Sequence, residues 1–507
     1  MKKSFFFMAS LLVAMIGCNK EPQGGNTQTE EGNVYMQFSV NMLTTRSGTD
    51  AEGDTNSDAS DDYEVGKDRE NKISTVDIVL ANETDYVVAK NVTPAAAATD
   101  TYVASFSTLD LKAGVTYDVY IYANCTAPAT KSLDEISNET VANITKDNAF
   151  WMTNAYEPIK TTLPTNLSLY TVPHNPLNLG SHYVERAMAR FDYMPKGPYT
   201  VGEGVTITLT EAALINQSKE FYMFRRVSND GTATNWTIGG VETPNNYVVD
   251  TDWDVKANGY NADLAKNFDQ HMTTPESWVW KSIAAEDLNE ADNWNGTDDG
   301  TTDYDGTHDL KDYYIWQYAK ENTIPNASAQ DHGISTGVVF KGKLTGDAVT
   351  AANGDMIFVF ENVLYGKWAA VETAAANTDA PATLVAAVNK VKAVENPTAA
   401  DYAAAGFTGY KPDNKGNYYA YYYYWNRHND NGNNTLMAPM EFAVVRNNVY
   451  KLCVDKIAKF GHPDPTNPDN PDPDPVDPAD PDEDLNYYFT VTVKVLPWVV
   501  RVNHIEF

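Results

Sequence analysis

The feature that most constrains this chain is its C-terminal end, where an acidic, proline-rich segment precedes an apolar one. Residues 462–484 read HPDPTNPDNPDPDPVDPADPDED, a composition that cannot bury a core. Within residues 485–507, apolar and polar residues alternate from Phe489 to Val495, the pattern of a strand with one buried face. An apolar strand at the end of such a linker needs a groove on a partner molecule to bury its apolar face. We therefore expect a donor strand for polymerisation. Its apolar set is Phe489, Val491, Val493, Val495, Leu496, Trp498, Val500 and Val502.

The apolar alternation changes phase at Leu496–Pro497. Proline has no backbone N–H to donate, so it indicates an edge position, a bulge or a bend between two halves of a strand. The tail therefore need not be one straight strand.

The first 18 residues have the layout of an export signal. Lys2 and Lys3 precede an apolar run over residues 4–16, and Gly17 and Cys18 form a small-residue cleavage point. The apolar run is too short to span a bilayer as a mature helix. This layout resembles a bacterial lipoprotein signal, in which Cys18 carries the lipid. An ordinary secretory signal with a chance cysteine is the alternative.

Composition indicates an exported globular protein rich in β structure. The 507 residues suffice for two or three domains, and the 31 tyrosines suit pleated sheets. A net charge of −32 argues against nucleic acid as a partner and against electrostatic binding to an anionic membrane. Cys125 and Cys453 lie in apolar runs, so we expect two buried free thiols rather than a disulfide.

A second strand pattern near the N-terminus looks removable. Residues 33–43 alternate, with Val34, Met36, Phe38, Val40 and Met42 on one face. The acidic segment that follows lacks periodicity and should be an accessible loop. Arg46 is the only basic residue between Lys20 and Lys67, so an Arg-specific protease would release the strand there. The alternative is an ordinary first strand with a long loop.

The body of the chain reads as short strands separated by turns, which predicts an all-β fold with a few helices. Predicted strands cover residues 73–80, 115–124, 184–193, 205–209, 221–226, 338–344, 356–364, 418–425 and 442–454. A capping box that begins at Ser132 predicts a helix over 132–144, and apolar residues at helical spacing predict another over 383–394. Lys196–Gly197–Pro198 is the expected domain boundary.

No motif predicts catalysis or a cofactor. Ser335 lies in a nucleophile-elbow pattern, but a strand follows it where that chemistry needs a helix. Asp303, Asp305 and Asp312 have calcium-loop spacing with a threonine in the first ligand position, so a solvated acidic loop is the expectation and calcium the weaker alternative. The run 418–425 (YYAYYYYW) either stacks on carbohydrate or alternates between a core face and an outer face.

Several motifs resemble the fimbrilins of the Bacteroidales, most closely the Mfa-type major subunit of the short (minor) fimbriae of Porphyromonas. These motifs are Val445–Tyr450 (VRNNVY), the Asp/Pro linker, Val493–Trp498 (VKVLPW), the lipoprotein signal, Tyr35–Met36, and Val184–Arg186 with Ala189–Arg190. The likeness is strong at both ends of the chain and thin through residues 229–404.

This resemblance implies two transthyretin-like β-sandwich domains and a C-terminal donor-strand appendage. It also implies export through the periplasm to the outer membrane as a lipoprotein, with lipid on Cys18 and cleavage at Arg46 by a gingipain-like protease. The expected segments are a signal peptide (1–18), a propeptide with the first strand (19–46), a flexible acidic loop (47–71), two sandwich domains (72–197 and 198–461), a linker (462–484) and the donor strand (485–507).

We therefore expect a structural stalk subunit of a cell-surface fimbrium that supports adhesion, and no enzyme. Its expected partners are identical subunits joined head to tail, accessory fimbrial subunits, the processing protease and a host or bacterial receptor; the membrane is reached only through the precursor's lipid. The alternatives are a monomeric surface lipoprotein that binds glycan, or an anchor or tip subunit. In the precursor, we expect the first strand to fill the groove and the tail to lie loose.

Overall fold

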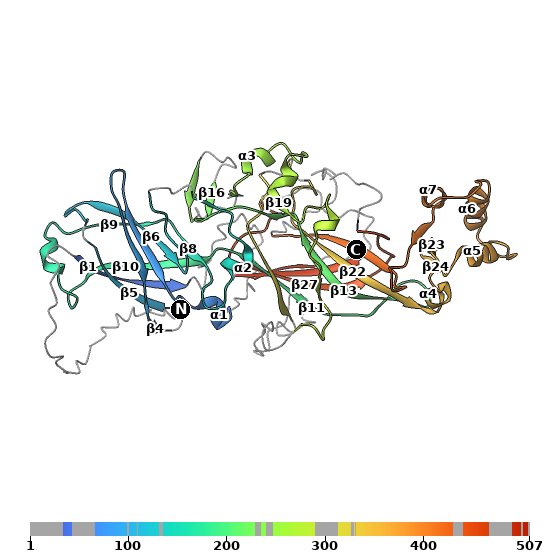
Figure 1. The fold of residues 1–507 in the computed structure, drawn as a ribbon, viewed down its shortest axis with the longest axis horizontal. Helices are drawn as coiled ribbons and strands as arrows, with labels where there is room; N and C mark the ends of the chain where they lie inside the picture. The colour runs from blue at the N-terminus through green and yellow to red at the C-terminus, as the bar shows by residue number, and fades with distance from the viewer. Residues whose placement is uncertain are drawn as a thin grey trace, which may run out of the picture.

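The structure is a computed structural model that describes residues 34–42, 66–98, 101–108, 110–130, 135–228, 235–239, 247–288, 313–325, 329, 331–428, 440–465, 489–497 and 500–504. Within these residues strands dominate and helices are few and short, which confirms the predicted all-β class. The molecule is elongated: one sheet lies at the left of Figure 1, two more at its centre, and a small helical cap at its right end.

The first sheet has nine strands. Their order is β3 (Tyr86–Val92), β2 (Val76–Ala81), β6 (Thr116–Ala123), β8 (Met152–Asn154), β10 (Leu177–Arg186), β1 (Val34–Met42), β5 (Thr101–Thr108) and β4 (Ala95–Ala98), with β9 (Ile159–Thr162) paired to β6. Its strands share one hydrophobic core, to which β1, β2 and β6 supply Phe38, Ile78 and Ile121, each with no exposed surface.

Two further sheets form a sandwich. One has the order β21 (Tyr314–Ala319), β11 (Ala189–Met194), β27 (Asn448–Ile457), β28 (Phe489–Pro497) and β29 (Val500–His504). The other has the order β12 (Tyr199–Thr200), β13 (Val205–Ile215), β22 (Gly337–Gly346) and β26 (Tyr419–Trp425), with β20 (Lys281–Ser282) paired to β13. Their inner faces share a core, in which the rings of Tyr193 and Phe340 lie 5.9 Å apart.

Small elements surround these sheets. The short strand pairs are β14 (Gln217–Ser218) with β19 (Phe268–Asp269), β15 (Phe221–Tyr222) with β7 (Ile136–Ser137), β16 (Arg226–Ser228) with β17 (Trp236–Ile238) and β18 (Tyr247–Val248), and β23 (Ile357–Phe360) with β24 (Val363–Tyr365) and β25 (Thr408–Tyr410). The helices are α1 (Asp68–Asn71), α2 (Val141–Ile144), α3 (Trp253–Lys256), α4 (Asp347–Ala352), α5 (Trp368–Ala375), α6 (Ala382–Lys392) and α7 (Ala399–Ala404), with 3₁₀ turns at Leu167–Tyr170, Leu264–Asn267 and Pro275–Ser277.

The two helix predictions had different outcomes. Helix α6 confirms the helix predicted over 383–394, because Leu384, Val388 and Val391 form its buried face. The helix predicted over 132–144 is wrong: Ile136–Ser137 is strand β7, and of residues 135–144, which the structure describes, only Val141–Ile144 are helical. Pairing of β7 with β15, far away in the sequence, overrides the local capping signal.

The chain passes from the first sheet to the second between Arg186 and Ala189. The run 184–193, predicted as one strand, is therefore two strands in different sheets. This change of sheet lies ahead of the expected boundary at Lys196–Pro198, and the segment limits given above stay predictions.

Candidate functional site

Strand β1 holds together two halves of the first sheet. It pairs in parallel with β10, from Met36 opposite Leu177 to Met42 opposite Val184. On its other edge it pairs antiparallel with β5, from Val34 opposite Thr108 to Asn41 opposite Thr101. Because β10 and β5 are neighbours of β1 and not of each other, β1 fills a strand-wide slot in the middle of the sheet. The expectation that the first strand occupies a groove is confirmed.

The side chains on the inward face of β1 are buried in the hydrophobic core. Val34, Met36, Phe38 and Val40 are at most 4% exposed. The Phe38 ring meets the rings of Phe106 and His182 edge-on, with centroids 6.0 and 5.7 Å away. Burial of these four side chains is worth about 6–12 kcal/mol as an upper bound. The slot is therefore a strong binding site for an extended apolar strand.

His182 on β10 is buried beneath β1. Its Nε2 lies 3.2 Å from the Leu179 carbonyl oxygen, and its Nδ1 has no hydrogen-bond partner among the described residues. Burial lowers the pKa of the imidazole, and the contact with the Leu179 carbonyl only partly opposes this effect. The side of the slot that β10 forms therefore favours a neutral histidine.

Helix α1 is the first described element after the segment that contains Arg46, and it enters a buried ionic network. Its Glu70 accepts hydrogen bonds from Arg190 Nη1 (2.9 Å) and the Tyr318 hydroxyl (2.6 Å). Arg190 Nε also donates to Asp192 (2.9 Å), and Lys451 Nζ lies 3.7 Å from Asp192. Burial alone would raise the pKa of Glu70, but the nearby guanidinium groups outweigh it and lower that pKa. Glu70 is therefore a carboxylate bound to β11 and β21 of the second sheet.

The neighbouring Asn71 ties α1 to the first sheet as well. Its side-chain oxygen accepts a hydrogen bond from Arg186 Nη2 on β10. Arg186 Nη1 donates to Asn447 Oδ1, 3.1 Å away, just before β27. Helix α1 thus joins both sheets at the point where the chain crosses between them. The two arginines in the apolar run 184–193 were the sequence signal for this network, which the sequence reasoning did not interpret.

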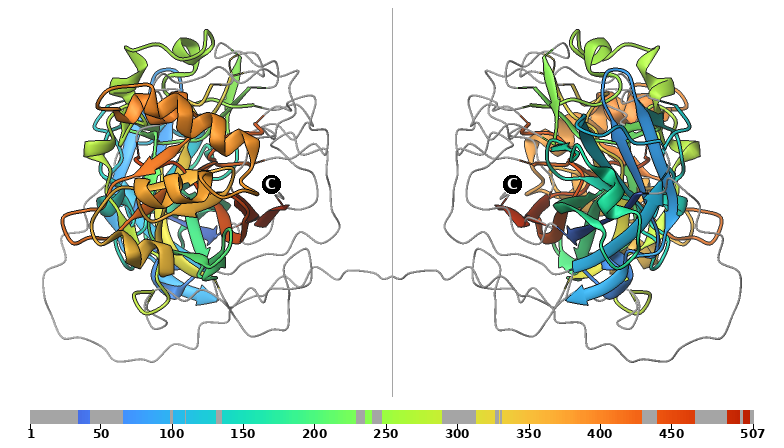
Figure 2. Two further views of the ribbon diagram at one scale, coloured as in Figure 1. Left: turned by 90° about the vertical axis from the view of Figure 1, so that its right-hand side faces the viewer. Right: turned by 90° about the vertical axis from the view of Figure 1, so that its left-hand side faces the viewer.

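The C-terminal strands pair with the body of their own chain. Strand β28 lies antiparallel to β27, from Ile457 opposite Phe489 to Asn448 opposite Pro497. Strand β29 runs back antiparallel to β28, so the chain reverses its direction after Leu496–Pro497 (Figure 2, dark red). Of the three alternatives for Pro497, an edge position, a bulge or a bend, the structure has the bend. The expectation of a loose tail is wrong, because β28 is paired with β27. Without β28, the backbone groups along that edge of β27 would lack hydrogen-bond partners.

The predicted donor residues lie in β28 and β29, except Trp498, which lies outside the described residues. Cys18, Arg46, Asp303, Asp305 and Asp312 also lie outside them. The described residues hold no group of three or more His, Cys, Asp or Glu side chains that could bind a metal. In this same part of the chain, no helix is long and apolar enough to cross a bilayer. Cys125 and Cys453 are buried free thiols, as predicted.

The tyrosine run is strand β26, and its two faces are both covered. Tyr418, Tyr422 and Tyr424 are buried in the sandwich core. On the outer face, Tyr421 contacts Trp280, with ring centroids 5.7 Å apart, and Trp425 stacks on His332 at 4.6 Å. This arrangement supports sandwich packing over an open carbohydrate platform. Ser335 is also buried, and its hydroxyl donates to the Asp331 carbonyl.

Two family models match this chain. The model of the major fimbrial subunit protein (FimA) matches residues 36–235, which include β1 and most of the first sheet. The model of the fimbrillin C-terminal region, major fimbrial subunit protein type IV, matches residues 416–504, which include β26, β27 and the C-terminal strands. No curated protein gives a significant match.

Solved structures also align over nearly the full chain. A fimbrilin (FimA) of Porphyromonas gingivalis is 14% identical, with 92% of this chain and 98% of that chain covered and a TM-score of 0.39. A candidate cell adhesion protein of Parabacteroides distasonis is 11% identical, with 94% and 99% covered and a TM-score of 0.38. One of Bacteroides eggerthii is 11% identical, with 92% and 97% covered and a TM-score of 0.35.

Proposed function

We propose that this chain, which belongs to the fimbrilin family of the Bacteroidales, is the stalk subunit of a cell-surface fimbrium and polymerises by protease-triggered strand exchange. It is a structural subunit rather than an enzyme. Closeness to the Mfa-type major subunit of the short (minor) fimbriae stays a prediction.

The observation that carries this proposal is the place of β1 in the middle of the first sheet. Cleavage after Arg46 would leave β1 without a covalent link to the body. Loss of β1 would open the edges of β10 and β5 and expose an apolar trench lined by Phe106, Leu179 and Val184. Such a trench strongly favours the addition of a strand from another molecule.

The effective concentration of a linked strand and the free energy of its burial explain why cleavage has to precede strand exchange. A strand that stays covalently linked to its groove has an effective concentration on the order of millimolar and returns faster than a competitor arrives. Once released, it is held only by its own burial, estimated above. A donor tail that buries about six large apolar side chains gains roughly 9–18 kcal/mol, again an upper bound, and can therefore replace it.

The tail that would fill the trench comes from the next subunit. Its acidic linker of about 20 residues reaches up to ~60 Å in polyproline-like form. This head-to-tail contact does not close on itself, so it builds a filament. In the precursor both surfaces are covered within one chain, because β1 fills its slot and β28 lies on β27. The uncut chain would therefore stay monomeric.

The export route belongs to the same proposal. Cys18 would carry the lipid that brings the precursor through the periplasm to the outer membrane, where an Arg-specific protease acts. Accessory fimbrial subunits and a host or bacterial receptor would complete the list of partners. A chain with both a removable first strand and a donor tail suits the stalk better than the tip or the anchor.

Gel and mass analysis of surface-extracted protein tests this function. We compare the wild type with Arg46→Ala and with a truncation that ends at Asp484. The expected result is a heat-resistant ladder in the wild type, with subunits that begin at Ser47, and monomers in both variants. Wild-type monomers that retain the residues before Ser47 would overturn the proposal.

A second candidate is a monomeric surface lipoprotein that binds glycan. It is favoured by the pairing of β28 with β27 of the same chain, which a self-contained monomer would retain. The same gel separates the two candidates, because this one predicts no ladder in any variant.

A further inference from the structure

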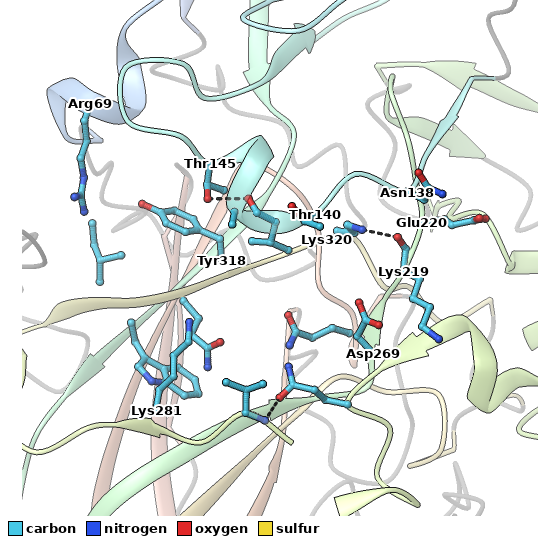
Figure 3. Close-up of a pocket in the computed structure, with 18 residues that line it drawn as sticks. Arg69, Asn138, Thr140, Thr145, Lys219, Glu220, Asp269, Lys281, Tyr318 and Lys320 are labelled. Atoms are coloured by element: carbon cyan, nitrogen blue, oxygen red, sulfur yellow. Dashed lines mark hydrogen bonds between the residues drawn. The ribbon is translucent and has the colours of Figure 1, made fainter. Parts of the chain in front are cut away.

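A cavity of about 780 Å³ lies between α2 and the strands of the second half of the chain (Figure 3). Its walls come from segments far apart in the sequence: Arg69 in α1, Thr140 before α2, Lys219 after β14, and Tyr318 in β21. This volume is in the range of sites for small organic ligands. The cavity is separate from the β1 slot and from the pairing of β27 with β28.

The charge of this cavity is opposite to that of the chain. Four basic side chains line it, namely Arg69, Lys219, Lys281 and Lys320, against two acidic ones, Glu220 and Asp269. The whole chain carries a net charge of −32. A positive concavity in so acidic a protein attracts an anion against the overall field.

Buried N–H donors without acceptors lie around the same cavity. Trp316 and Gln317 are 8% and 7% exposed, and neither Trp316 Nε1 nor Gln317 Nε2 has a hydrogen-bond partner among the described residues. The same holds for Arg69 Nε. Unsatisfied buried donors are uncommon in folded proteins, and all three belong to side chains of residues that line this cavity.

Two lysines of this cavity keep free hydrogen-bonding capacity. Lys320 is 4% exposed, and the structure gives its ammonium one hydrogen bond, to the Lys219 carbonyl. Since an ammonium has three donors, two remain available. Lys281 is exposed, and although its backbone pairs with Ala212 of β13, its ammonium has no hydrogen bond or ion pair among the described residues. Burial lowers the pKa of Lys320, and the nearby carboxylates of Asp269, Glu139 and Glu220 only partly oppose this effect.

The remaining lining is typical of a carbohydrate site rather than of a site for an acidic peptide. Asn138, Thr140 and Gln270 present groups that pair with hydroxyls. Asp269 and Glu220 would accept hydrogen bonds from sugar hydroxyls, whereas they would repel the many carboxylates of an acidic peptide.

We propose that this cavity binds an acidic sugar, whose carboxylate lies toward Lys281 and whose hydroxyls meet the amide and carboxylate side chains of the wall. This site does not depend on strand exchange, and it would make the body of each subunit adhesive.

Isothermal titration calorimetry on the purified, uncut full-length chain tests this site. The probes are sialyllactose, its neutral counterpart lactose, and hexaglutamate as an acidic peptide. Lys281→Glu is the test variant, because Lys281 is exposed and its replacement should not affect folding. Lys160→Glu is the matched control: Lys160 is an exposed lysine on β9, and it does not line the cavity.

The expected result is binding of sialyllactose but not of lactose, weakened by salt and at least about tenfold weaker in Lys281→Glu. The Lys160→Glu variant should bind like the wild type. Equal binding of lactose, an unaffected Lys281→Glu variant, or no binding of sialyllactose would each overturn the proposal. Binding of hexaglutamate alone would replace it with an acidic peptide site. All these outcomes are read on monomers, so they are independent of the polymerisation test.

Discussion

Glu70 and Arg190 form an ion pair that is almost completely excluded from solvent, with Glu70 Oε2 and Arg190 Nη1 2.9 Å apart. Glu70 belongs to the short helix α1 and Arg190 to a central strand of the second sheet. The pair therefore fixes helix α1 to the point where the two sheets join.

Loss of this pair should destabilise the junction. Glu70→Gln removes one of the carboxylate partners of the buried Arg190, so we expect a loss of about 3 kcal/mol in the free energy of unfolding at neutral pH. Urea denaturation measures it. Asp68→Asn is the control, an exposed carboxylate on the same helix that should change stability by less than about 0.5 kcal/mol. Equal stability of the two variants would contradict a stabilising role of the pair.

The first sheet should weaken in mild acid because of His182. Burial lowers its pKa below the unfolded value of about 6.5, so the unfolded chain binds a proton that the folded chain does not. The stabilisation is complete above about pH 6.5 and declines as the pH falls below it. We expect His182 to contribute to the loss of stability between about pH 7.5 and 5.5.

The measurement is the free energy of unfolding against pH for His182→Gln beside the wild type. The variant should have a flatter profile over this range, and the exposed His174→Gln should follow the wild type. Parallel profiles for wild type and His182→Gln would show that His182 does not titrate in this way.

Truncation of Phe38 should loosen β1. Phe38→Ala leaves a cavity between Phe106 and His182, and the expected loss in stability of the uncut chain is about 3–5 kcal/mol. After cleavage, the weakened strand should leave faster and the ladder should form sooner. Ser39→Ala, on the opposite face of β1, is the control for both measurements. A ladder that forms at the wild-type rate would mean that release of β1 does not limit assembly.

A disulfide should lock the tail onto its own chain. Cys453 and Thr492 are opposite one another in the register of β27 and β28, and opposed residues of an antiparallel pair have Cβ atoms close enough to bridge. Oxidised Thr492→Cys should therefore give cut monomers without a ladder, and dithiothreitol should restore the ladder. Thr490→Cys, opposite Lys456, is the control. A ladder from the oxidised and cross-linked variant would show that the tail does not have to leave β27.

Local alternation made much of the fold predictable from sequence. Strands β1, β22 and β26 follow period-2 patterns, and helix α6 follows a helical one, so each carries its own signal. Residues 184–193 are buried throughout, so buried and exposed positions do not alternate there and nothing in the pattern indicates the change of sheet. This run was therefore predicted as one strand.

The site was only half predictable for a similar reason. The first strand was recognised from its own residues, whereas Glu70 and Arg190 are 120 positions apart and share no local pattern. The pairing of β28 with β27 depends on which strand edges the folded body leaves open, and no residue of the tail encodes that. Edges and long-range pairs belong to the tertiary structure and not to a window of sequence.

The cavity beside α2 has a consequence at the scale of the fibre. A subunit that binds a sugar weakly contributes little alone, but a polymer presents one such cavity per subunit to a surface that bears many sugars. Linked sites can raise avidity by roughly 10²–10⁴ without any new contact. Shaft length would then set how firmly a cell holds on, because each added subunit is one more point of attachment.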